Sequence, residues 1–434
     1  MADDSGGCEG RTRREYVKYS GAVVGGGLFA GCASQSGGDS TATEAASEAA
    51  TETAPETATE PASDTATEPA SEAATTTDTA TETETQTPDQ SYSVTMSPVG
   101  TVEFDEVPEQ AAVYSNHDAD ILVSLGQADV IQSLGFPDNY SAAYYDELPG
   151  VSFDTSRLTK LYDDGVDKEV FYELDSDVHH IDPVWFGSWS SFGESDLEEI
   201  ESNVGPFFAN YHSRTNVAPD SASDYQFYTI WELVDKYAQA YQVPERGARL
   251  KAIRDQMLSD IRAELPPQEE RPEVGVVWYD RKKESFWVYH LNAPGFQNAH
   301  TRPLRANDAL SEFDSGPRSG WSDSALIGME AMLDADPDVL LQFADWQNPD
   351  TATEAFFALD DHPVGRELSA VQNDRLYASG DAFQGPIVNI FQIELTAKQL
   401  YPDLFGQPPE PGNTTGLGEM FDPQAVADIV NGEF

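Results

Sequence analysis

The segment between residues 244 and 267 is PERGARLKAIRDQMLSDIRAELPP. Its apolar side chains recur at steps of three or four residues, which predicts one helix of about five turns with a single buried stripe. The stripe consists of Leu250, Ile253, Met257, Ile261 and Leu265. Pro244 suits the first residue of a helix, and Pro266 and Pro267 end it. The same period begins earlier, from Tyr225 to Tyr241, and predicts a preceding helix.

Apolar, strand-like runs alternate with helical runs on both sides of these helices. Such alternation is typical of a parallel sheet covered by helices, and about 340 residues after position 90 exceed the usual size of one core. We therefore predict an α/β fold with two lobes. The expected parts are an N-terminal lobe at 91–221, an interlobe helical segment at 222–267, a C-terminal lobe at 268–405 and a tail at 406–434.

The second half of the chain shows the alternation most clearly. Strands are predicted at 274–279 and 286–289, on either side of the polar turn 281–284, and at 338–343 and 375–378. Helices are predicted at 325–333, 364–370 and 386–400.

The N-terminus has the order of an export signal. Arg13 and Arg14 precede a small, apolar run that ends at Gly31, and Cys32 follows directly. This order predicts a twin-arginine signal peptide over 1–31, cleavage before Cys32 and lipidation of its thiol. Residues 33–90 contain no aromatic residue, Leu, Ile, Val or Met, so they cannot bury a core and are expected to be a disordered tether.

The chain is strongly acidic. Lys and Arg number 24 against 77 Asp and Glu, a formal net charge of −53, and most of the excess lies after residue 90. Such a surface repels itself unless concentrated salt screens it, which indicates a halophilic source. It also excludes nucleic acid as a ligand. The other cysteine, Cys8, is lost with the signal, so the exported domain has no disulfide and no cysteine nucleophile.

Aromatic and basic side chains are the candidate ligand contacts. Tryptophans in or just after predicted strands and loops offer rigid apolar area to an organic ligand; they are Trp185, Trp189, Trp278, Trp287, Trp321 and Trp346. Arginines are scarce after residue 90, and a guanidinium fits the oxygens of an anionic or polar chelate. The candidates are Arg157, Arg302, Arg305 and Arg318.

Direct metal binding is the less favoured alternative. It would need His117, His180 and either His290 or His300 to converge, because His179 and His180 are adjacent in a strand and must point to opposite faces. No metal site is therefore assigned. The chain has no P-loop, dinucleotide fingerprint, Gly-x-Ser-x-Gly or His-Glu-x-x-His motif, so catalysis has no support.

Several segments together resemble the substrate-binding lipoproteins of ABC importers for iron–siderophores and cobalamin. They are ADILVSLG at 119–126, MLDADPDVLL at 332–341, HPV at 362–364, VQNDRLY at 371–377 and the closing LYP at 400–402. The likeness covers most of residues 98–405. It implies two three-layer α/β lobes joined by a long α-helix, with the ligand cleft between the lobes.

The resemblance also implies what the protein does. It would capture an iron(III) chelate outside the cell and deliver it to a membrane permease with its ATPase subunits, as a monomer that needs no cofactor and catalyses nothing. Glu194 and Glu312 match the family's acidic permease-docking positions. Cobalamin or heme is the nearest alternative ligand. An exported enzyme or a surface-interaction protein is the alternative of another class.

Overall fold

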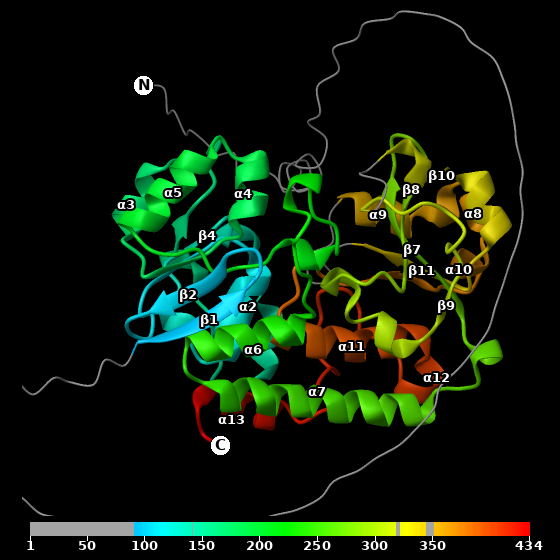
Figure 1. Ribbon diagram of the computed structural model, residues 1–434. Helices are drawn as coiled ribbons and strands as arrows, with labels where there is room; N and C mark the ends of the chain where they lie inside the picture. The colour runs from blue at the N-terminus through cyan, green and yellow to red at the C-terminus, as the bar shows by residue number, and fades with distance from the viewer. Residues whose placement is uncertain (1–90, 141, 318–321, 344–350) are drawn as a thin grey trace, which may run out of the picture. The chain divides into compact units, whose positions relative to one another are not determined.

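The computed structural model describes residues 91–140, 142–317, 322–343 and 351–434. These residues belong to one compact unit. The unit contains two separate main sheets, each flanked by helices, and they lie in the left and right halves of Figure 1. The two-lobe α/β fold predicted from the sequence is confirmed.

The central sheet of the N-terminal lobe is parallel. An antiparallel hairpin of β1 (Tyr92–Met96) and β2 (Gly100–Phe104) precedes it. β3 (Ala111–Val113) pairs with β6 (Val178–His180), and β4 (Ser133–Leu134) pairs with β5 (Thr159–Lys160). Single bridges join the two pairs and add a further segment beside β6; they are Ala111 to Ile131 and His179 to Phe207.

Helices cover both faces of this sheet. α2 (Asn116–Ser124) contributes its apolar residues to the main core. The other face carries a separate core built with α3 (Glu169–Leu174), α4 (Pro183–Trp189) and α5 (Glu194–Asn203). The strand alternation is visible at β6: the His179 ring meets Phe171 of α3, and the His180 ring stacks on Tyr237 on the opposite face.

The C-terminal sheet is mixed, with the order β10-β8-β7-β11-β12 and β9 beside the start of β7. Its strands are β7 (Glu273–Asp280), β8 (Ser285–Tyr289), β9 (Asn307–Asp308), β10 (Leu326–Gly328), β11 (Val339–Gln342) and β12 (Leu376–Ala378). The core on one face includes α8 (Met329–Ala335), α9 (Thr351–Phe357) and α10 (Ser369–Gln372). The predicted β7–β8 hairpin is present and antiparallel.

Two predicted helices of this lobe are wrong at their ends. The one expected at 325–333 begins only at Met329, because Leu326–Gly328 pairs with β8 as a strand. The one expected at 364–370 is a 3₁₀ turn at Gly365–Glu367 followed by α10. In both places a short apolar run serves a strand or a tight turn, and periodicity does not distinguish these from a helix.

A helical hairpin lies beneath the sheets in Figure 1. α6 (Ile230–Ala240) starts at a capping box in which the Thr229 and Glu232 side chains bond each other's backbone N–H groups. α7 (Pro244–Glu264) begins at Pro244, as predicted, and buries Leu250, Met257 and Ile261 of the expected stripe. The helix expected from Tyr225 begins later, because Tyr225 lies in the preceding loop.

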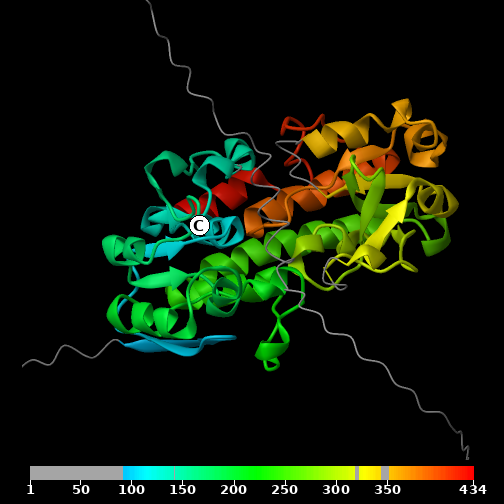
Figure 2. The same ribbon diagram turned by 90° about the horizontal axis from the view of Figure 1, so that it is seen from above.

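α11 (Pro386–Leu400) is buried along its whole length. Asp120 of α2 accepts the backbone N–H of Val388 (3.1 Å), so an N-terminal-lobe carboxylate caps this helix. Beyond α12 (Pro402–Phe405) the chain returns through α13 (Pro423–Asn431), which packs against α7 and α2. Figure 2 shows this red helix among the cyan elements of the N-terminal lobe. No helix within the described ranges is long and apolar enough to cross a membrane.

Candidate ligand-binding site

Aromatic side chains gather where the parallel strands of the N-terminal lobe end. Tyr114 follows β3, Phe136 follows β4, Tyr162 follows β5, and Trp185 and Trp189 lie on α4 directly after β6. Neighbouring ring centroids are 5.1 to 6.2 Å apart. Open α/β sheets place their ligands at the carboxyl ends of such strands. We call these five residues, together with Tyr211, the aromatic cluster.

The cluster has both buried and accessible members. The Tyr211 ring stacks on Trp185, with centroids 4.0 Å apart and planes inclined by 22°. Trp185 is buried, whereas Tyr162, Trp189 and Tyr211 are partly exposed. The cluster therefore offers aromatic surface to a ligand while its inner rings hold the outer ones in position.

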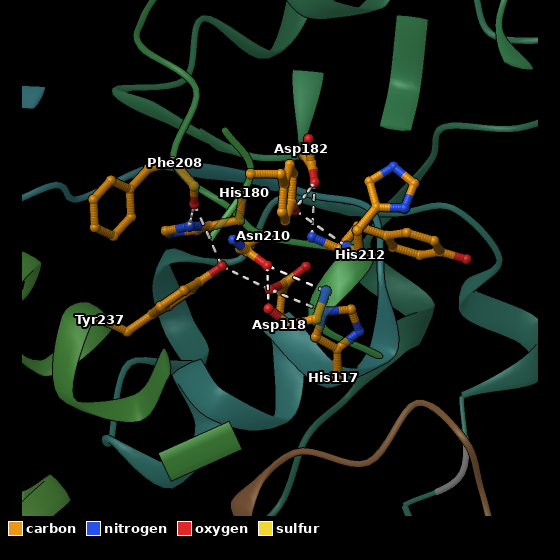
Figure 3. A network of polar contacts seen from close by, with 11 residues as sticks. His117, Asp118, His180, Asp182, Phe208, Asn210, His212 and Tyr237 are labelled. Carbon is orange, nitrogen blue, oxygen red and sulfur yellow. Dashed lines mark hydrogen bonds and ion pairs between the residues drawn. The ribbon is translucent and has the colours of Figure 1, made fainter. Parts of the chain in front are cut away.

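Asp182 fixes the geometry of the cluster (Figure 3). One carboxylate oxygen accepts the N–H groups of Val184 (2.9 Å) and Trp185 (3.2 Å) and so caps α4. The other accepts the N–H of Tyr211 (2.9 Å) and the hydroxyl of Tyr225. Burial raises the pKa of Asp182, and the hydrogen bond from Tyr225 opposes that shift. This one side chain joins α4 to the loop that carries Tyr211.

His117 lies on α2 beside the cluster with no hydrogen-bond partner among the described residues for either ring nitrogen. Its side chain is 1% exposed, and its Nε2 is 3.5 Å from Oδ1 of Asp118, too far for a good hydrogen bond. Burial and the nearby charge of Arg214 lower the pKa of His117 to about 3. The neutral ring therefore keeps one donor and one acceptor available.

Asp118 is buried next to His117 (Figure 3). The Tyr237 hydroxyl donates to its Oδ1 over 2.6 Å. Burial raises the pKa of Asp118 to about 8; the Tyr237 bond lowers it and the charge of Asp182 raises it further. At neutral pH this carboxyl group is therefore largely protonated.

Two loops of the C-terminal lobe meet the cluster. Phe296, after β8, has its ring centroid 5.0 Å from that of His117. Phe383, after β12, lies 6.2 Å from both His117 and Tyr211. The two lobes thus approach one another around His117 and Tyr211.

Arg214 connects the lobes at this point. Its guanidinium carbon lies 4.6 Å from the Phe383 ring centroid and 5.2 Å from that of Tyr211. Nη1 donates to Oε1 of Gln297 (3.2 Å), and the buried Nε has no partner among the described residues. The backbones of the two lobes also approach each other closely here, because a Cβ atom at Gly295 would lie 2.2 Å from the carbonyl oxygen of Arg214.

A series of buried side-chain hydrogen bonds includes Gln384, the residue after Phe383. Trp231 of α6 donates to Asn389 of α11 (3.3 Å), Asn389 donates to Gln384 (2.7 Å), and the Gln384 amide contacts Nδ1 of His300 (2.8 Å). Burial lowers the pKa of His300 to about 3, and its Nε2 has no partner among the described residues. His117, Arg214 and His300 therefore each hold an unused buried polar atom near the meeting of the lobes.

Residues 199–382 match the sequence model of a family described as periplasmic binding protein. This part of the chain is therefore similar to that family. Members of this family are solute-binding proteins and not enzymes. No curated protein sequence matches the chain.

Solved structures have the same fold. One is a periplasmic binding protein from Veillonella parvula DSM 2008, with a TM-score of 0.55 and 14% identity, over 75% of this chain and 95% of that one. Another is the iron uptake ABC transporter substrate-binding protein PiuA from Streptococcus pneumoniae Canada MDR_19A, with a TM-score of 0.50 and 12% identity, over 71% and 97%. At this identity the likeness concerns the fold alone.

The described tryptophans among the predicted ligand contacts fall into two groups. Trp185 and Trp189 belong to the aromatic cluster. Trp278 and Trp287 are opposite each other across the β7–β8 hairpin and half-buried, and the Lys283 ammonium lies 5.4 Å from the Trp287 ring centroid. Only the first group is placed at the carboxyl ends of the N-terminal strands.

The predicted arginines bind backbone carbonyl groups or lie exposed. Arg157 donates to the carbonyls of Ile131 (3.2 Å) and Ala128 (2.9 Å). Arg302 donates to those of Ala293 and Gly295. Arg305 is exposed, with a positive φ of 56°. Arg318, Trp321, Trp346 and Cys32 lie outside the described residues.

Glu194, the first residue of α5, and Glu312 are exposed, so their docking role stays a prediction. The histidines do not converge on a metal. Both ring nitrogens of His180 are engaged, by the Phe208 carbonyl and the Tyr241 hydroxyl, each at 2.8 Å. The described residues contain no group of three or more His, Cys, Asp or Glu placed to hold a metal ion.

The sequence analysis did not select four residues that the structure adds to the candidate site: Tyr211, Arg214, Phe296 and Phe383. Tyr211 and Arg214 follow Phe207 and Phe208, which extend the sheet beside β6. The rule that sites follow strand ends would have selected them if Pro206 to Phe208 had been treated as a strand. Phe383, five residues beyond β12, follows from the same rule.

Proposed function

We propose that this protein is the extracellular receptor of an ABC importer and captures an iron(III) chelate. The observation that carries the proposal is the aromatic cluster at the strand ends, where His117 and Arg214 hold unused buried polar atoms next to loops of the second lobe. Unpaired buried polar groups are costly, so a ligand that bonds them gains affinity. The fold shared with PiuA, named as an iron uptake substrate-binding protein, supports this cargo.

Binding would use the cluster without any chemical step. The accessible faces of Tyr162, Trp189 and Tyr211 offer apolar contact to the organic part of a chelate. Nε of Arg214 and the neutral ring of His117 would bond its oxygen atoms. Because Phe296 and Phe383 come from the other lobe, a ligand held here contacts both lobes at once.

The proposal extends to the membrane. The twin-arginine signal and Cys32 would place a lipid-anchored receptor on the outer face of the cytoplasmic membrane, where it meets the permease and its ATPase subunits. The Cys32→Ser variant is expected to appear in the growth medium, since it lacks the acylation site. Cell fractionation checks this, and continued membrane retention of the variant would reject the anchor.

A fluorescence titration tests the cargo. Residues 91–434 in concentrated salt would be titrated with ferrichrome, ferric enterobactin, ferric citrate, heme, cobalamin and bare divalent metals. We expect saturable tryptophan quenching by a ferric chelate. The Trp189→Phe variant should lose much of that quenching, whereas Trp287→Phe, on the β7–β8 hairpin outside the aromatic cluster, should keep it. A response to heme or cobalamin alone would assign that ligand instead, and no response would reject the receptor proposal.

A further inference from the structure

The charges at the candidate site limit the kind of chelate that fits. Among the described cationic side chains, Arg214 is the one that makes a hydrogen bond or a ring contact with the aromatic cluster. Arg157 and Arg302 are occupied by backbone carbonyls, and Lys168 pairs with Asp196 (2.8 Å) and Glu199 (2.5 Å). Among the residues that the structure describes, a single guanidinium therefore contacts the candidate site.

The other described groups that contact the aromatic cluster add no further positive charge. His117 is neutral, because burial lowers its pKa. Asp118 and Asp182 are buried acids, and any ionised fraction of either would repel an anionic ligand. The chain as a whole carries −53, so its long-range field also opposes anions unless salt screens it. A ligand with several negative charges would therefore be repelled both by the acids at the site and by the net charge of the chain.

We propose that the cargo is a chelate of low net charge, neutral or singly negative, such as a ferric trihydroxamate, and that Arg214 selects for it. This inference rests on the proposed receptor function and narrows its substrate class. Arg214 offsets about one negative charge and bonds chelate oxygens through Nε, while the aromatic cluster binds the neutral organic shell. A trianionic ferric tricatecholate would leave about two charges without a partner.

Equilibrium dialysis of iron-labelled chelates tests the inference. The probes are ferrichrome, a neutral trihydroxamate complex, and ferric enterobactin, a trianionic tricatecholate complex, each with residues 91–434 in concentrated salt. Each charge left unpaired near the surface costs about a factor of five, so two such charges should make ferrichrome bind about 25-fold more tightly. Lowering the salt concentration should widen the difference, because screening decreases.

Two variants show whether Arg214 sets the preference. Arg214→Gln should weaken ferrichrome binding by about 10-fold, since a hydrogen bond to a charged donor and a cation–π contact are lost, and should weaken enterobactin binding further. Arg249→Gln, a matched change on the exposed face of α7, should leave both affinities unchanged. Equal or tighter binding of ferric enterobactin would overturn the inference and keep the receptor function. Binding of neither chelate, with no response to the other ligands of the fluorescence titration, would instead reject the receptor function itself.

Discussion

Replacing Gly295 by Ala should drive apart the two segments that close the candidate site. The new Cβ atom would lie 2.2 Å from the carbonyl oxygen of Arg214 and 2.7 Å from the carbonyl carbon of Thr215. Contacts of a Cβ atom under 3.0 Å essentially do not occur, so one segment must move by at least 0.8 Å, the difference between 3.0 and 2.2 Å. Both obstacles are backbone atoms and cannot rotate away.

The cost follows from overpacking, which typically amounts to about 1–3 kcal/mol. The free protein can relieve the strain by separating the two segments. A ligand that contacts both lobes must bring the segments together again and so restore the strain on binding. Chelate affinity should then fall by about 5- to 150-fold, with a smaller loss in the free energy of unfolding.

Titration calorimetry with the chelate that binds the parent protein measures this change, and urea unfolding in concentrated salt measures stability. Gly328→Ala is the matched control in the same lobe, because Gly328 has extended backbone and no atom within 4 Å of the new Cβ. If Gly295→Ala binds the chelate as tightly as Gly328→Ala does, the Arg214–Gly295 contact does not contribute to the bound state.

Three further predictions concern other parts of the fold. Asp120→Ala should lower the free energy of unfolding by about 3 kcal/mol, because buried donors of α11 lose their acceptor. Asp120→Asn keeps one acceptor oxygen and should lower it by about 1 kcal/mol. Denaturant unfolding measures both changes. The folded-state pKa of Asp118, about 8, exceeds the ordinary 3.8, so its contribution to stability is complete below pH 4 and is lost as pH rises toward 8. Asp118→Asn should reduce this loss of stability, which the free energies of unfolding at pH 5 and pH 8 measure. If the variant loses as much stability as the parent protein between these pH values, the raised pKa of Asp118 is wrong. Changing Glu194 and Glu312 to Ala should abolish iron uptake by cells and leave chelate affinity intact; undiminished uptake would reject this docking pair.

The sequence predicted the parts of the fold that depend on local periodicity. The stripe from Leu250 to Ile261, with Pro244 ahead of it, predicted α7 because an amphipathic helix follows from spacing alone. The β7–β8 hairpin followed from two apolar runs around a polar turn. The helix predicted over Leu326–Gly328 was wrong, because this three-residue strand forms only through its pairing with β8, and no local sequence pattern shows that pairing.

The candidate site was predicted only in part for a similar reason. Trp185 and Trp189 were selected because they follow a recognisable strand, and the structure places them in the aromatic cluster. Arg302 was selected because arginine is scarce in this chain, yet its guanidinium binds carbonyls of its own loop, a contact that depends on how that loop folds back. Arg214 reaches Phe383 and Gln297 across the lobes, more than 80 residues away, and such contacts arise from packing.

The most direct test is the position of iron in crystals of residues 91–434 grown with a bound ferric chelate. Anomalous scattering from iron locates the metal without assumptions about the ligand. We predict one peak between the aromatic cluster and the loops that carry Phe296 and Phe383, with Arg214 and His117 bonded to chelate oxygens. A peak elsewhere, such as over Trp278 and Trp287 on the β7–β8 hairpin, would contradict the assignment of the site.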